Sequence, residues 1–130
     1  MKKQLLLPLF VALLVALPAC KKNDEPKADL LGFWNVMERT RITTTTGASP
    51  VTSKTTYSEG QFTLDFKANG DLVVNGNATD PEPWKRISET RIEIDGLEYD
   101  IRQLTASQLV LFSTQPVSGS VREETFVCER

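Results

Sequence analysis

The sequence predicts an all-β fold, and three observations lead to that prediction. From residue 30 onward, short apolar and β-branched runs alternate with polar residues, as expected for strands with one buried face. Gly, Asn, Asp and Pro residues that favour turns separate these runs at short intervals. No segment of this part keeps a helical period for long. We therefore expect one all-β domain over residues 30–130.

Eight or nine short strands are expected along this domain. The most regular lies at 61–67, where Phe62, Leu64 and Phe66 alternate with polar residues. The turn sequence Asn69-Gly70 then predicts a hairpin with the strand at 71–75. The remaining strands are expected, in chain order, at 33–46, 51–58, 84–88, 91–94, 97–101, 109–112 and 121–129, with a turn at 115–119.

Two architectures accommodate such a series of short antiparallel strands. They are a small up-and-down eight-stranded barrel and a β-sandwich. The barrel is favoured, because a meander of hairpins that does not close leaves two open edges.

The chain begins with a segment that is typical of a signal peptide. Lys2 and Lys3 precede an apolar run at Leu5–Leu17, and a small residue, Ala19, follows it. The run is shorter than the ~20 apolar residues that span a bilayer, which argues against a single-pass anchor. Residues 1–19 are therefore predicted to be removed.

The end of this segment, Leu17-Pro18-Ala19-Cys20, resembles the lipobox of bacterial lipoproteins. The resemblance implies cleavage before Cys20 and acylation of that residue, palmitate included. Several acyl chains on one residue hold a protein stably at a membrane. The alternative is an ordinary signal peptide with Cys20 merely nearby.

Residues 20–29 are predicted to form a charged, flexible tether between the lipid and the domain. Charged residues so close to the lipidated Cys resemble the export signals of Bacteroidetes lipoproteins. Lys21, rather than an acidic residue, follows Cys20, which favours the outer membrane over the inner one. Whether the domain faces the periplasm or the cell surface stays open.

Composition argues against several classes of function. Removing Lys2 and Lys3 from the 15 basic residues leaves 13 against 17 acidic ones, a balance of −4 that disfavours nucleic-acid binding. The chain has no His, the commonest general base and metal ligand. No enzyme activity, metal or cofactor is therefore expected. Three carboxylate pairs are expected to be solvated rather than catalytic: Asp80 with Glu82, Asp95 with Glu98, and Glu123 with Glu124.

Cys128 is the one thiol left if Cys20 carries lipid, so no disulfide can form within the chain. It lies in a strand-like run, which favours a small buried hydrophobe. An intermolecular bridge is the alternative.

An ordered set of motifs resembles the lipocalin-like domains of Bacteroidetes lipoproteins, over nearly all of residues 30–130. The set comprises Leu31-Gly32-Phe33-Trp34, Phe62-x-Leu64-x-Phe66, Asn69-Gly70-Asp71-Leu72, Trp84, Ile92-Glu93-Ile94, Tyr99-Asp100-Ile101, Leu104-Thr105 and Leu109-Val110-Leu111. The resemblance implies an eight-stranded cup in which Trp34 closes one end and an Arg packs over it. Arg122 and Arg130 are the two candidates for that Arg.

Together with the lipobox-like segment, this resemblance predicts an outer-membrane lipoprotein whose barrel binds a small hydrophobic ligand. The candidate ligand-binding residues are Trp34, Phe62, Phe66, Trp84, Tyr99 and Leu111. The same side chains could instead fill the barrel as ordinary core. In that case the chain would be a structural or protein-interaction lipoprotein, an accessory subunit or inhibitor without a small-molecule ligand.

Overall fold

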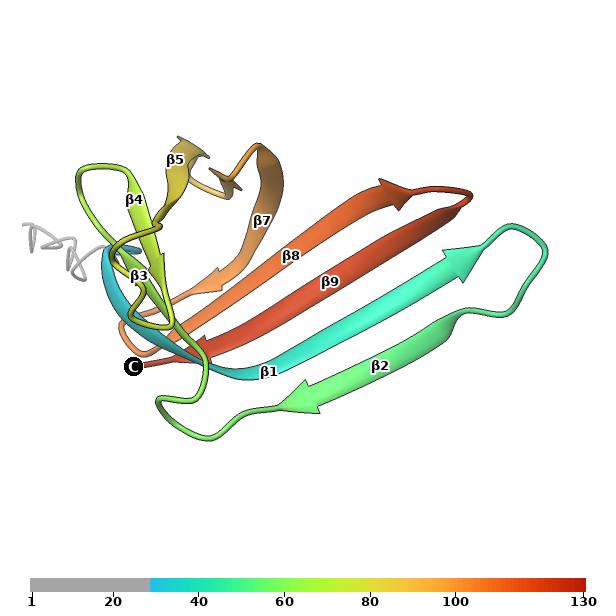
Figure 1. Cartoon of the computed structure of the whole chain (residues 1–130), viewed down its shortest axis with the longest axis horizontal. Coiled ribbons are helices and arrows are strands. Elements are labelled where there is room, and N and C mark those ends of the chain that lie inside the picture. The colour runs from blue at the N-terminus through green and yellow to red at the C-terminus, as the bar shows by residue number, and fades with distance from the viewer. Residues whose placement is uncertain (1–28) are drawn as a thin grey trace, which may run out of the picture.

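A computed structural model describes residues 29–130, which form nine strands (Figure 1). In chain order the strands are β1 (Gly32–Thr45), β2 (Val51–Thr56), β3 (Thr63–Phe66), β4 (Asp71–Val74), β5 (Glu82–Ser88), β6 (Arg91–Ile94), β7 (Leu97–Leu104), β8 (Gln108–Val117) and β9 (Ser120–Glu129). Within residues 29–130 there is no helix long and apolar enough to cross a membrane. The predicted signal peptide, Cys20 and nearly all of the tether lie outside the described residues.

Eight of these strands close into an antiparallel barrel, which confirms the predicted barrel over the sandwich. Strands β3 to β9 follow one another as a meander, each paired with the next. Strand β1 closes the circle, since Gly32–Asn35 pairs with β3 while Asn35–Thr45 pairs with β9. Closure thus gives the two edge strands of the meander, β3 and β9, a hydrogen-bonding partner in this part of the molecule.

The ninth strand, β2, lies outside this circle. It pairs with Glu38–Thr43, the part of β1 that extends beyond the contact with β3. A register shift between Val36 and Glu38, typical of a β-bulge, separates the two parts of β1. Strands β2, β1, β9 and β8 thus extend together beyond the barrel, as Figure 1 shows. We call this extension, β2 with residues 38–45, 113–117 and 120–124, the projecting sheet.

The structure corrects the predicted turn at 115–119. Strand β8 continues through Gln115, Pro116 and Val117, each paired with β9, and the turn is confined to Ser118 and Gly119. Beyond Phe112 no described residue of β7 pairs with β8, so this half of β8 is an edge. A Pro is tolerated on such an edge because its missing N–H can face solvent. The turn prediction was wrong because the sequence does not show which strands lie at an edge.

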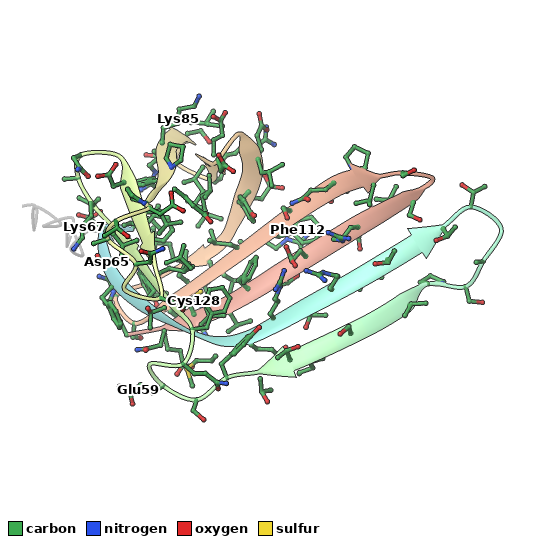
Figure 2. All side chains as sticks on the ribbon, viewed as in Figure 1. Glu59, Asp65, Lys67, Lys85, Phe112 and Cys128 are labelled. Carbon is green, nitrogen blue, oxygen red and sulfur yellow. The ribbon has the colours of Figure 1, made fainter. Side chains whose placement is uncertain are left out.

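The apolar core lies inside the barrel. Its largest fully buried side chains include Trp34, Phe66, Leu72 and Ile92, which come from four different strands. Cys128 belongs to the same core, which confirms its prediction as a buried residue. Figure 2 shows side chains crowded within the barrel, where Cys128 lies, and spaced well apart along the projecting sheet.

Candidate ligand-binding cavity

One end of the barrel is closed around Trp34. The indole is fully buried, and its Nε1 donates a hydrogen bond of 2.9 Å to the carbonyl oxygen of Leu30. The guanidinium of Arg130 stacks on the indole with its Cζ 3.8 Å from the ring centroid. Arg130 also donates to the carbonyl oxygens of Leu31 and Asp29. Of the two candidates, Arg130 therefore packs over Trp34, and Arg122 lies elsewhere.

The closed end of the barrel also explains why a glycine occurs two residues before Trp34. Gly32 has a φ of 102°, a conformation that side-chain-bearing residues rarely adopt. A Cβ at this position would make only an ordinary contact with Arg130, 3.6 Å from its Nη1, so the backbone conformation is what favours glycine. Gly32 thus provides the backbone conformation with which the indole of Trp34 and the guanidinium of Arg130 pack together at this end of the barrel.

A cavity of about 190 Å³ lies toward the other end, next to the projecting sheet. Most of its wall is apolar and comes from five strands and the loop before β3: Phe62, Leu64, Leu72, Val74, Ile94, Leu111 and Phe126. Tyr99, Arg39, Glu82 and Glu124 supply the polar part of the wall. Because Glu82 is exposed, the cavity reaches the molecular surface on that side.

An arginine–glutamate cluster forms the boundary between the cavity and the projecting sheet. Glu124 is 6% exposed and accepts hydrogen bonds from two guanidinium groups. Its Oε1 lies 2.6 Å from Nη2 of Arg39 and 3.0 Å from Nη2 of Arg41. The expectation that this carboxylate is solvated was wrong, because Glu124 shares the inward face of β9 with Phe126. Its neighbour Glu123 is exposed, as expected.

The cluster and burial together set the protonation of the polar wall. Partial burial by itself lowers the pKa of Arg39, but the hydrogen bonds and charges of Glu124 and Tyr57 raise it above its ordinary value. Burial, followed by the charges of Glu124 and Glu82, raises the pKa of Tyr99. At neutral pH the wall therefore presents a neutral phenol and a permanent guanidinium.

The six candidate ligand-binding residues divide into two groups. Phe62, Tyr99 and Leu111 line the cavity. Trp34 lies in the closed end described above, outside the cavity lining. Phe66 and Trp84 also lie outside the lining and pack edge-to-face, with ring centroids 5.1 Å apart.

Sequence reasoning did not assign Arg39 or Arg41 to a site, and it placed Glu124 among the solvated carboxylates. Glu124 could have been found, since it alternates with Phe126 and Cys128 and so shares their face. The two arginines could not, because counting by twos from Trp34 and Val36 places them outside the barrel. The bulge after Val36 reverses that assignment.

Fold and cavity together define the class of this protein as a small closed antiparallel β-barrel with a partly apolar cavity and a projecting sheet. Comparisons with protein-family models, with curated proteins and with solved structures give no match to this chain. Within the described part of the chain, no three Cys, Asp or Glu residues are grouped to hold a metal ion.

Proposed function

We propose that this chain is an outer-membrane lipoprotein whose lipocalin-like barrel binds a small hydrophobic molecule. The observation that supports the proposal most is the cavity itself, because a barrel filled by its own side chains would have none. Its apolar wall favours a hydrophobic ligand, and its few polar groups can orient one.

The size of the cavity limits the ligand. An apolar cavity of ~150 Å³ stays dry and holds one benzene molecule. A cavity of about 190 Å³ therefore accommodates one aromatic ring or a short branched chain, and not a long acyl chain. Phenylpropanol, a neutral molecule with one ring, is a suitable test ligand.

Membrane attachment is the part of the proposal that depends on the sequence alone. The lipobox-like Leu17-Pro18-Ala19-Cys20 and the charged residues after it support a lipid anchor at Cys20. Anchoring would hold the binding domain at the surface where small hydrophobic molecules partition.

Isothermal titration calorimetry with phenylpropanol tests ligand binding. We expect saturable binding by the wild-type protein and at least a tenfold loss in Val74→Phe, whose larger side chain fills the cavity. Val121→Phe is the matched control, because Val121 is 44% exposed in the projecting sheet and outside the cavity lining. Binding that is equal in both variants, or absent from the wild type, would contradict the proposal.

A second candidate function, protein interaction, is favoured by the projecting sheet. All six residues of β2 are exposed, and among the described strands β2 pairs with β1 alone. An unpaired strand edge is a template for an extended segment of another protein. Barrel closure does not involve β2, so its Thr-rich sequence could serve such contacts.

Site-specific photocrosslinking in cells distinguishes this second function. A crosslinker at Thr52 on β2 is expected to capture a partner protein, whereas one at Glu98 on the barrel is not. No capture from Thr52, or equal capture from both positions, would leave ligand binding as the better account.

A further inference from the structure

One face of the projecting sheet continues the wall of the cavity. Paired residues of an antiparallel sheet share a face, and residues two apart along a strand stay on it. Three rows cross this face from the cavity outward: Leu111–Phe126–Arg39, then Ser113–Glu124–Arg41, then Gln115–Arg122–Thr43. The first row lines the cavity, so the second and third rows, which we call the inner face, lie directly beyond it.

The charges along these rows are unbalanced. Arg39, Arg41 and Arg122 carry three positive charges there against the single negative charge of Glu124. Arg39 and Arg41 share the carboxylate of Glu124. No β2 residue on this side of the sheet is charged, because Thr55, Ser53 and Val51 pair with Arg39, Arg41 and Thr43.

Arg122 differs from the other two arginines because one donor of its guanidinium is unsatisfied within the described part of the chain. Its Nε is buried, and no atom of the described residues accepts a hydrogen bond from it. A buried donor without an acceptor costs free energy, more so when it belongs to a charged group. The planar guanidinium matches the oxygens of a carboxylate or phosphate, which would satisfy this donor.

We propose that Arg122, with Arg41 beside it, binds the anionic head group of an amphipathic ligand whose apolar part occupies the cavity. This inference rests on the proposed function and specifies its ligand class. The ligand is a small organic acid or phosphate monoester with one apolar group. Gln115 and Thr43, paired with Arg122 on the inner face, can add neutral hydrogen bonds to the same head group.

The spacing of the rows sets the length of this ligand. Leu111 and Gln115 are four residues apart on β8, or about 13 Å at ~3.3 Å per residue. The long side chains of Arg122 and Arg41 shorten that distance. A ring with a linker of a few carbon atoms therefore places its head group near these arginines while the ring stays in the cavity.

Three ligands that carry a phenyl ring on a three-carbon chain test the proposal by calorimetry: phenylpropanol, phenylpropanoate and phenylpropyl phosphate. We expect the anions to bind the wild-type protein about tenfold tighter than the alcohol, the advantage of one charged hydrogen-bonded pair. Arg122→Met should remove that advantage without weakening binding of the alcohol. The tighter anion then shows whether the natural ligand is an organic acid or a phosphate monoester.

Arg102→Met is the matched control, since Arg102 stacks on Phe112, which lies on the opposite face of the sheet. It should keep the full preference for the anions, and Arg122→Lys should keep part of it. Equal binding of alcohol and anions by the wild type would overturn the inference and leave the proposed function standing. An equal loss in Arg102→Met and Arg122→Met would also overturn it. Failure of all three ligands to bind would overturn the proposed function as well.

Discussion

Glu124 is the residue on which the junction between the barrel and the projecting sheet depends. It is buried and bonded to Arg39 and Arg41, whose guanidinium groups would face each other without a counter-charge if it were neutral. Removing one member of a buried ion pair is strongly destabilising. Both arginines are about one third exposed, which reduces the effect.

Glu124→Gln is therefore expected to lower the free energy of unfolding by about 2 kcal/mol, measured by urea denaturation. Glu123→Gln removes the same charge from the exposed face of the same strand. It should change stability by less than about 0.5 kcal/mol. Equal effects of the two substitutions would show that the arginine–glutamate cluster does not contribute to the free energy of unfolding.

The thiol of Cys128 is unreactive in the folded protein because it lies in the core. Burial raises the pKa of its thiol from 9.0 to about 12, so almost none is thiolate near neutral pH. We expect the native protein to resist iodoacetamide at pH 8 and to react once unfolded in urea, as followed by mass spectrometry. Rapid modification of the native protein would contradict the burial.

The same pKa shift predicts a pH dependence of stability. The folded state holds the proton more tightly than the unfolded chain, so this contribution is complete below pH 9.0. It is lost as the pH rises from 9.0 toward about 12. Cys128→Ala should remove this part of the alkaline loss of stability, and an unchanged alkaline profile in that variant would contradict the shift.

At the scale of single elements, strand β1 organises the molecule. Its first residues close the barrel against β3, and the bulge after Val36 redirects the rest of the strand into the projecting sheet. Alternation in the sequence predicts most strands, as at Leu64 and Phe66, because one face of each is buried. It does not predict the bulge, because β1 beyond Val36 has mostly polar residues on both sides and no regular alternation marks the inserted residue.

The strands differ in how well their backbone bonds are protected. The barrel strands have partners on both sides, whereas β2 and residues 113–117 of β8 have one partner each. We expect amide hydrogens of Leu111 and Ile92 to exchange far more slowly than those of Thr52 and Ser53. Hydrogen exchange followed by NMR measures the difference, and equal protection would mean that the projecting sheet opens only with the barrel.

At the scale of the whole molecule, sequence predicts the architecture better than the site. The Gly32-x-Trp34 motif and the resemblance it supports anticipate an arginine over the indole, and the structure identifies it as Arg130. Half of the candidate ligand-binding residues line the cavity, because alternation separates inward from outward positions. It does not separate the packed end of a barrel from the hollow one, which depends on how all strands tilt and stagger.

Membrane attachment is a prediction for the whole chain. Cys20→Ala should move the protein from the membrane fraction to the soluble fraction, since the acyl chains are expected to supply the attachment. Cell fractionation with immunodetection measures the change. The Cys128→Ala variant is the control and should stay in the membrane fraction, whereas an unchanged distribution of Cys20→Ala would contradict a lipid anchor.

The central claim is that the barrel interior takes a small hydrophobic ligand, and methyl NMR tests it most directly. Addition of phenylpropanol should shift the methyl resonances of Leu72, Ile94 and Leu111 saturably, because these residues line the cavity. Val121, exposed in the projecting sheet, should not shift. Absence of saturable shifts at the three cavity residues, or shifts confined to exposed residues such as Val121, would contradict the account.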